Sequence, residues 1–105
     1  MKLTGDELLA MFSALANPHR LRILARLREH GRDYVSQLAR EIGISRPLLH
    51  LHLQKLEEAG LVRSTLELSD DGKALKYFEV TGFEVLVNSE SIRIAVASLS
   101  ADGKK

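Results

Sequence analysis

The stretch that decides the fold runs from Tyr34 to Arg63 and reads YVSQLAREIGISRPLLHLHLQKLEEAGLVR. It contains two short helical patterns separated by a tight turn. Ala39 is small enough to let a second helix cross closely over the first, and Gly43 permits the backbone turn between them. Ser45 then caps the second helix. The leucines that recur after it at helical spacing are Leu49, Leu53 and Leu56. The pattern predicts a helix-turn-helix over residues 36–59.

An apolar seam fixes how the two predicted helices cross, and it determines which face of the second helix stays outside. The members of the seam are Ile42, Ile44, Leu49 and Leu53. The opposite face of the second helix is left on the surface, where it can enter a DNA major groove. By their spacing, the residues on that face are Arg46, Pro47, His50, Leu51 and Gln54. The sequence therefore predicts a DNA-binding protein that reads DNA with this helix.

Two further helices are predicted before this motif. Thr4 and Glu7 fit the capping box, in which each side chain accepts a hydrogen bond from the other residue's backbone N–H. This predicts a helix over residues 4–16. Asn17 and Pro18 then suit the N-cap and the first position of a second helix, which ends at Gly31.

A β-hairpin is predicted directly after the helix-turn-helix. Residues 61–68 and 76–80 alternate as strands around the turn at residues 69–72, where Asp-Gly favours a tight connection. Residues 83–87 predict another short extended piece, and residues 89–100 a last helix capped by Asn88 or Ser89. The expected fold is mainly α with a small β-hairpin, a winged helix-turn-helix whose wing spans residues 61–80.

Composition bounds what else the chain can do. With 105 residues, 45% of them hydrophobic, one domain with a modest core is expected. The chain has no cysteine, which excludes disulfides and thiolate metal sites. No apolar run approaches the roughly 20 residues of a membrane span, so we expect a cytoplasmic protein. No Gly-rich phosphate loop or catalytic constellation is evident, so neither an enzyme nor a cofactor is expected.

The net charge of +1 hides an uneven distribution along the chain. Residues 19–63 contain nine Lys or Arg against five Asp or Glu, a net charge of +4. Residues 64–103 contain three against seven, a net charge of −4. The basic excess coincides with the predicted helix-turn-helix, as attraction to phosphate requires, and it supports the DNA-binding interpretation.

Several segments together resemble the ArsR-type winged-helix transcriptional regulators. They are Leu15-Ala16-Asn17-Pro18-His19-Arg20-Leu21-Arg22-Ile23-Leu24, Ser36-Gln37-Leu38-Ala39, Ile44-Ser45-Arg46-Pro47 and Glu58-Ala59-Gly60-Leu61-Val62. The resemblance covers roughly residues 12–80. It implies a homodimer whose first and last helices, residues 4–16 and 89–100, pair across a two-fold axis. It also implies that paired recognition helices bind a palindromic operator, usually to repress transcription.

The sequence departs from that family in three places. Tyr34-Val35-Ser36 stands where many members carry the Cys-Val-Cys of a metal sensor. The last helix lacks the histidines and paired carboxylates with which other members bind zinc. We therefore expect no metal effector. In the recognition helix, Leu48-Leu49-His50-Leu51 replaces the polar run of many relatives, and Leu51 offers an apolar contact to a thymine methyl group.

The residues expected to contact DNA fall into three groups. In the recognition helix, Arg46 is the best candidate because a guanidinium can bind guanine bidentately; Gln54 and Lys55 are further candidates. In the preceding helix, the family match suggests Ser36 and Gln37, although a capping role alone explains Ser36. In the hairpin, the basic candidates for backbone contacts are Arg63, Lys73 and Lys76. Acidic residues of the same hairpin repel DNA, so a purely structural wing is equally consistent with the sequence.

The four histidines do not predict a metal site. His50 and His52, two residues apart on a helix, point in nearly opposite directions and cannot chelate one ion. His19 and His30 have no evident partner ligands, so all four are interpreted as surface or helix-edge residues. Four arginines of the second helix form no single face, and we interpret them as a solvated surface; they are Arg20, Arg22, Arg26 and Arg28.

Apolar stripes on the terminal helices predict the dimer interface. They consist of Leu8, Phe12 and Leu15 in the first helix and Ile92, Val96 and Leu99 in the last. Two other functions remain open. An architectural DNA binder would share the fold without base discrimination, and the near-neutral net charge argues against it. A winged helix that contacts another protein would suit Leu48 and Leu51 if they form an exposed patch.

Overall fold

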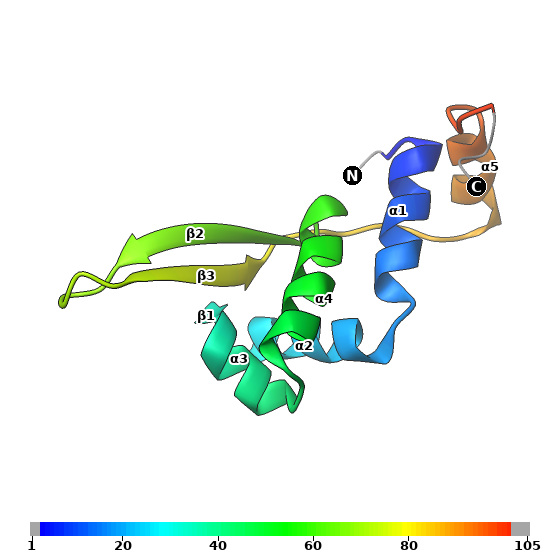
Figure 1. Cartoon of the computed structure of the whole chain (residues 1–105). Helices are drawn as coiled ribbons and strands as arrows, with labels where there is room; N and C mark the ends of the chain where they lie inside the picture. The colour runs from blue at the N-terminus through cyan, green and yellow to red at the C-terminus, as the bar shows by residue number, and fades with distance from the viewer. Residues whose placement is uncertain (1–2, 102–105) are drawn as a thin grey trace.

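The computed structural model describes residues 3–101, and within them it contains five helices and a three-stranded antiparallel sheet. In chain order the elements are α1 (Gly5–Leu15), α2 (Pro18–His30), β1 (Asp33–Tyr34), α3 (Val35–Ile42), α4 (Arg46–Glu58), β2 (Val62–Leu68), β3 (Ala74–Val80) and α5 (Ser89–Val96). Figure 1 shows α1 and α5 at one end of the molecule, α2 to α4 in the middle, and the β2–β3 hairpin projecting from the other side. This is the winged helix-turn-helix that the sequence predicts.

The helix starts follow the predicted capping residues in α1 and α2. The Thr4 hydroxyl accepts from the backbone N–H of Glu7 at 3.1 Å, and the Glu7 carboxylate accepts from the N–H of Thr4 at 2.9 Å. Asn17 accepts from the N–H of Arg20 at 3.2 Å, directly before Pro18 at the first helical position. These side chains satisfy donors that have no partner inside the helix, which fixes where each helix begins.

The turn between α3 and α4 depends on Gly43. Its φ of +84° and ψ of +32° lie in the left-handed region that favours glycine. There the N–H groups of Gly43 and Ile44 both donate to the carbonyl of Ala39, at 2.8 and 3.2 Å, and end α3. The Ser45 hydroxyl accepts from the N–H of Leu48 at 3.3 Å and begins α4. The predicted helix-turn-helix is confirmed.

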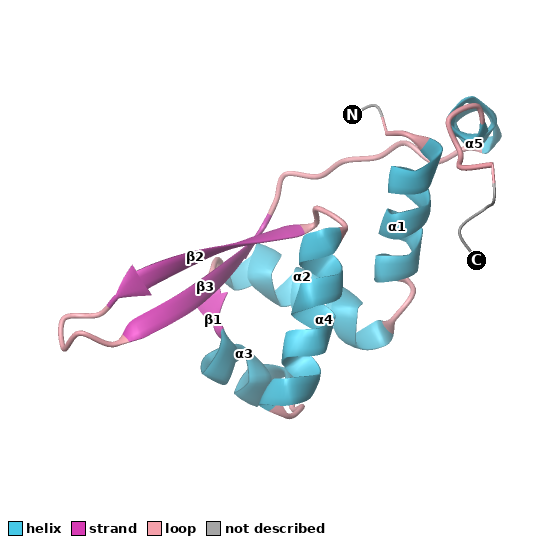
Figure 2. Cartoon of the chain, turned by 45° about the horizontal axis from the view of Figure 1, so that its top comes forward, coloured by secondary structure: helices cyan, strands magenta, loops and turns pink. Residues whose placement is uncertain are grey.

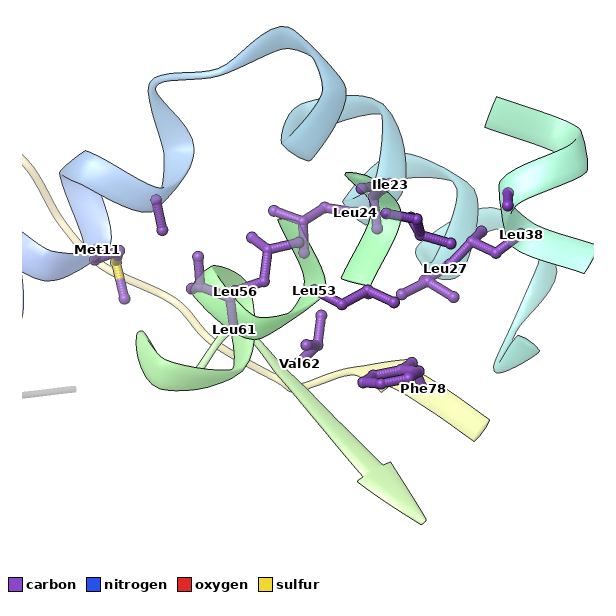
Figure 3. Packing of buried hydrophobic residues seen from close by; sticks show 13 residues of the cluster. Met11, Ile23, Leu24, Leu27, Leu38, Leu53, Leu56, Leu61, Val62 and Phe78 are labelled. Atoms are coloured by element: carbon purple, nitrogen blue, oxygen red, sulfur yellow. The ribbon is translucent and has the colours of Figure 1, made fainter. Parts of the chain in front are cut away.

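The core lies between the three middle helices, the C-terminal half of α1 and the base of the hairpin. Figure 3 shows leucines of α2 and α4 meeting along one seam, with Phe78 of β3 closing its lower side. The buried residues of this cluster are Met11, Ala14, Ile23, Leu24, Leu27, Leu38, Ala39, Leu49, Leu53, Leu56, Leu61, Val62 and Phe78. Burying each large apolar side chain contributes about 1.5–3 kcal/mol, so this cluster fixes how α4 is oriented.

The sheet has the order β1–β3–β2, and both pairings are antiparallel. β1 contributes two residues, and Tyr34 pairs with Tyr77 of β3 in register. Figure 2 shows this short strand beside β3, directly before the start of α3. Arg32 extends the contact, because its guanidinium donates twice to Glu67 of β2, at 2.5 and 3.1 Å, and lies 4.4 Å from the ring centre of Tyr77. The wing is thus tied to the helical part along the middle and outer half of the hairpin.

Three local predictions need correction. Ser36 does not cap α3; the helix begins at Val35 after an extended Tyr34, because Tyr34 is held in the sheet. Residues 83–87 form no strand, although Phe83 and Val85 alternate inward against the core. The last helix ends at Val96 instead of reaching residue 100. Beyond it the N–H groups of residues 97–99 donate to carbonyls three residues earlier, a tighter turn than an α-helix.

Candidate nucleic-acid interface

The exposed side of α4 carries the recognition-helix residues that the sequence analysis expects to contact DNA. Arg46, Pro47, His50, Leu51, Gln54 and Lys55 are all exposed. The opposite face consists of Leu49, Leu53 and Leu56, each at most 1% exposed. Because that buried face is locked into the core, the exposed face is presented in a fixed orientation. It forms a continuous strip along the helix, from its first residue to its last turn.

Arg46 stands at the first position of α4, and its side chain has no hydrogen-bond or ion-pair partner among residues 3–101. A guanidinium in this state can form a bidentate contact with a guanine edge or a phosphate without first breaking another bond. The pyrrolidine ring of Pro47 occupies the second position, where its missing N–H costs no helical hydrogen bond. The start of α4 therefore offers an unpaired cation to an approaching ligand.

A shallow groove of about 400 Å³ runs along one side of this face. Its lining is Arg20, Leu48, Leu51, His52, Gln54, Lys55 and Glu58. Leu51 is 60% exposed, and Leu48 is 38% exposed. Gln54 donates to Glu58 at 3.3 Å, within hydrogen-bond range but long. The groove combines apolar contact area with amide and ammonium donors, a mixture that suits base edges and thymine methyl groups.

The candidates on α3 are more constrained than those on α4. Ser36 and Gln37 are half-buried. The Gln37 amide donates to Glu41 at 2.7 Å, and its oxygen accepts from Arg40. Arg40 is exposed on the same helix, and the sequence analysis missed it. Its signal was the three-residue spacing to Gln37, which places both side chains on one helical face. The structure therefore adds a cation beside the predicted pair.

The basic residues of the wing differ in what holds them. Arg63 donates to Glu79 on the neighbouring strand at 2.8 Å, and Lys76 lies 5.5 Å from the ring centre of Phe78. At the tip, the ammonium group of Lys73 has no ion-pair partner within residues 3–101. Asp71 accepts from the Ser69 hydroxyl, which lowers the pKa of Asp71 and keeps its charge beside Lys73. The tip therefore carries charges of both signs.

His52 and Arg20 are not the surface residues that the sequence analysis expected. His52 is 7% exposed, because it faces inward while His50 faces outward. The Arg20 guanidinium donates to the Nδ1 atom of His52 at 3.0 Å and to the carbonyl of Ala14 at 2.6 Å. The contact between Arg20 and His52 could not be read from local spacing, since the two residues are 32 positions apart. His19 and His52 lie with their ring centres 5.4 Å apart.

The terminal helices pack side by side within one chain, as Figure 1 shows. Leu8 is buried, Phe12 and Leu15 are half-buried, and Ile92, Val96 and Leu99 are exposed. Between the helices lies an almost wholly apolar groove of about 160 Å³. Its lining is Gly5, Leu8, Leu9, Phe12, Ile92, Ala95, Val96 and Leu99. Leu9 was not among the predicted interface residues, although it belongs to the same apolar stripe.

Two further features bear on function. Among residues 3–101, no group of three or more His, Asp or Glu side chains is arranged to hold a metal ion. Within the same residues, none of the helices has the length and apolar character that crossing a membrane requires.

Comparison with known proteins shows which transcriptional regulators the chain is similar to. A family described as a helix-turn-helix domain matches residues 15–65. An uncharacterised HTH-type transcriptional regulator from Methanocaldococcus jannaschii is 34% identical over 87 residues, which are 83% of this chain and 90% of that protein.

Solved structures agree with this placement. The homodimeric winged helix-turn-helix DNA-binding domain of a possible ArsR-family regulator from Mycobacterium bovis is 26% identical, with a TM-score of 0.65, over 88% of this chain and 74% of that one. An ArsR-family transcriptional regulator is 25% identical, with a TM-score of 0.61, over 92% and 87%. With its capped α4, its three-stranded sheet and these relatives, the chain belongs to the HTH-type transcriptional regulators, and its winged helix-turn-helix fold is similar to that of ArsR-family structures.

Proposed function

We propose that this protein represses transcription as a homodimer that binds a palindromic operator through α4. The observation that carries the proposal is the exposed face of α4, where Arg46, His50 and Leu51 stand on a helix whose other face is fully buried. A rigid helix with an unpaired guanidinium at its start is suited to direct readout in a major groove. Repression is the usual role in the ArsR-type family that the sequence resembles.

The apolar end of the molecule supports a dimer. Within residues 3–101, seven of the twelve large apolar side chains that are exposed lie on the terminal helices or on the segments directly before and after α5. They are Leu9, Leu86, Val87, Ile92, Ile94, Val96 and Leu99. Such a concentration on one end marks an interaction surface. The homodimeric Mycobacterium bovis domain, which has the same fold, makes a second copy the preferred occupant.

Two-fold symmetry then determines the form of the DNA site. In a homodimer the two α4 helices are related by a two-fold axis, so each reads the same bases in opposite directions. Successive half-sites that face the protein are about 34 Å apart, one turn of B-DNA. The operator is therefore expected to be an inverted repeat. A dimer bound there represses by occupying the DNA.

Selection of bound DNA from a random library tests this proposal. The full chain is incubated with random duplexes at moderate salt, and the bound fraction is sequenced over several rounds. An inverted repeat whose half-sites are about one helical turn apart is the expected result. Uniform enrichment would instead indicate a nonspecific DNA binder. Reporter expression from a promoter that contains the selected site should fall when the protein is produced, which tests the direction of regulation.

A protein-contact function has one observation in its favour. Leu48 and Leu51 expose apolar surface on the face of α4 that the proposal assigns to DNA. Absence of any DNA enrichment, with a folded dimer in solution, would favour this alternative over the proposed function.

A further inference from the structure

One guanidinium joins three helices at the junction of α1, α2 and α4. Arg20 belongs to the first turn of α2. Its Nε atom donates to the carbonyl of Ala14 at 2.6 Å, and its Nη2 atom donates to the carbonyl of Ser13 at 3.4 Å. Its Nη1 atom lies 3.0 Å from the Nδ1 atom of His52 on α4. The rigid fork of an arginine can serve all three acceptors at once, whereas an ammonium group cannot match this geometry.

The place of these contacts gives them a mechanical role. Ser13 and Ala14 lie in the last turn of α1, where carbonyls lack partners inside the helix and a cation is favoured. α1 is one of the two helices that carry the exposed apolar groove. His52 lies on the inner side of α4, two residues from His50 on the outer side. The guanidinium therefore connects α1, which is proposed to form the dimer interface, directly to α4, which is proposed to bind DNA.

We propose that Arg20 and His52 are positioning residues for DNA binding. Their bond requires a neutral imidazole, so its loss as the pH falls weakens operator binding. This inference rests on the proposed function. In a symmetric dimer the distance between the two α4 helices is set through α1. A bond between α1 and α4 keeps that distance matched to the operator. Losing the bond lets each reading helix shift without unfolding the domain.

The protonation state follows from the donor. A guanidinium can only donate, so Nδ1 of His52 must carry a lone pair and the proton must reside on Nε2. Nε2 is buried and has no hydrogen-bond partner among the described residues, and the same holds for Nδ1 of His19. A second proton on His52 would displace the Arg20 donor and place two cations side by side. The bond and the charged imidazole therefore exclude each other.

The charged groups around His52 reinforce this exclusion. α2 contributes Arg20 and His19, both basic or titratable. α4 contributes Lys55 and Glu58, which line the same groove and have opposite charges. α1 contributes no titratable side chain in its last two turns. Burial lowers the pKa of His52 from its usual 6.5, and Arg20 and His19 lower it further. The bond is thus complete above that usual value and is lost as the pH falls through the lowered pKa.

The pH arm of the test uses operator DNA obtained by selection. His52→Gln can retain an acceptor for Arg20 but cannot gain a proton. Two proteins are compared, one with His52→Gln and one with His52 intact, and both also carry His50→Gln. The His50→Gln substitution is needed because His50 lies on the proposed DNA face, where a protonated histidine would itself strengthen binding. Binding isotherms are recorded from about pH 7.5 to about pH 4.5, well below the usual histidine pKa of 6.5, because the pKa of His52 is lowered. With His52 intact, operator affinity should fall by about five-fold or more; in the His52→Gln variant it should stay level. Identical pH profiles would overturn the proposal.

The Arg20 arm separates positioning from direct contact. Arg20→Met should lower operator affinity at about pH 7.5 by about ten-fold while leaving the salt dependence unchanged. A salt dependence reduced by about one ion per subunit would mean that Arg20 touches phosphate, which overturns the positioning role. Circular dichroism and sedimentation are the controls that check whether the variant is still a folded dimer. If the operator affinity of Arg20→Met were unchanged, the proposed positioning role of Arg20 would also be overturned.

An NMR measurement without DNA keeps the inference testable if no operator is found. Imidazole nitrogen shifts in the whole protein should show His52 neutral near pH 7, with its proton on Nε2. In Arg20→Met the pKa of His52 should rise towards its usual value, because a neighbouring cation and a hydrogen bond to the neutral ring are both removed. An unchanged His52 pKa would show that the bond does not exist in solution. Failure of DNA selection alone contradicts the proposed function, not this bond.

Discussion

The basic residues of this protein differ in whether a partner already holds them. Arg26, Arg32 and Arg63 are in ion pairs with Glu41, Glu67 and Glu79. The cations without an ion-pair partner in the part of the chain that the structure describes include Arg46, Lys55 and Lys73. An exposed ion pair is worth little to stability, but it occupies the donors that a phosphate or base would need. Availability, more than charge, therefore distinguishes the DNA-contact candidates.

Arg46→Ala is expected to reduce operator binding by about ten-fold or more. A bidentate contact to guanine is worth roughly 1–3 kcal/mol of discrimination, and its loss should relax the preference at one base pair in each half-site. Isotherms on operator and scrambled DNA measure both effects, and circular dichroism checks the fold.

Lys73→Ala is the matched comparison, because Lys73 is also unpaired but lies at the wing tip. It should lower affinity for all sequences alike and reduce the salt dependence by about one ion per subunit. If operator affinity survived Arg46→Ala unchanged, α4 would not be the reading helix.

Local rules predicted the residues whose roles are local. The caps at Thr4, Asn17 and Ser45 and the exposed face of α4 follow from spacing within one or two turns. The burial of His52 could not follow from such rules, because it depends on Arg20, which is distant in sequence. Sequence patterns give the side of the helix on which a residue lies, but not which other element covers that side.

At the scale of elements, the same contrast explains the start of α3. Ser36 is a good capping residue by type, yet the pairing of Tyr34 with Tyr77 extends the backbone one residue earlier and moves the helix start to Val35. Tertiary pairing here overrides a local preference. The predicted hairpin, by contrast, forms with Gly72 at φ +84°, since its turn depends on adjacent residues alone.

An ion pair joins α2 to α3 and predicts a pH dependence of stability. Arg26 donates to Glu41 at 2.8 Å, and Gln37 donates to the same carboxylate. These bonds lower the pKa of Glu41 from 4.5 to about 2. The unfolded chain takes up a proton near pH 4.5 while the folded chain does not, so the stabilisation is present above 4.5 and is lost as the pH falls towards 2.

Glu41→Gln should therefore flatten the acid side of the stability curve. Melting temperatures followed by circular dichroism between about pH 5 and pH 2.5 provide the measurement. Glu84→Gln serves as control, because Glu84 is exposed and has no ion-pair partner among residues 3–101. The idea fails if both variants retain the same acid-induced drop as the unaltered protein.

The crossing of α1 and α5 depends on the absence of a side chain at Gly5. A Cβ atom there would lie 2.5 Å from the carbonyl oxygen of Ala95 and 3.0 Å from Leu99. The backbone N–H of Gly5 also donates to the Ser98 hydroxyl at 2.8 Å. These contacts set the closeness of the two helices that form the apolar groove.

Gly5→Ala should push α5 away and destabilise the protein by about 1–3 kcal/mol, the usual cost of overpacking. Chemical denaturation of Gly5→Ala and of Gly82→Ala provides the comparison, because a Cβ at Gly82 meets nothing within 4 Å. Equal stability of the two variants would show that the α1–α5 contact is looser than the structure indicates.

At the scale of the whole molecule, the shape is elongated. The Cα radius of gyration is 15.8 Å, and the extents are 51 × 26 × 23 Å, whereas a compact chain of this length has a radius of about 13 Å. The wing at one end and the α1–α5 pair at the other account for the difference. The end formed by α1 and α5 exposes much apolar surface, and a second copy of the chain would cover it.

Val96→Asp should dissociate the proposed dimer. Val96 is 56% exposed on α5, and losing its burial in both copies costs about 3 kcal/mol, roughly a hundred-fold in the dissociation constant. Sedimentation over a range of concentrations measures the effect. Leu68→Asp is the control, because Leu68 is 75% exposed but lies on the wing. A dimer that persists in Val96→Asp, or that is lost equally in Leu68→Asp, would place the interface elsewhere.

The contacts of Gly5 with Ser98 and of Asp6 with Ser100 join residues 93 and 94 positions apart. The helix-turn-helix, by contrast, is built from neighbours in the chain, which meet early in folding because little loop entropy opposes them. During synthesis the reading unit can therefore form while α1 still lacks its partner helix. In a growing chain the helix-turn-helix therefore forms first and the α1–α5 surface forms last. Two unfinished copies that emerge side by side have no completed α1–α5 surface through which to dimerise.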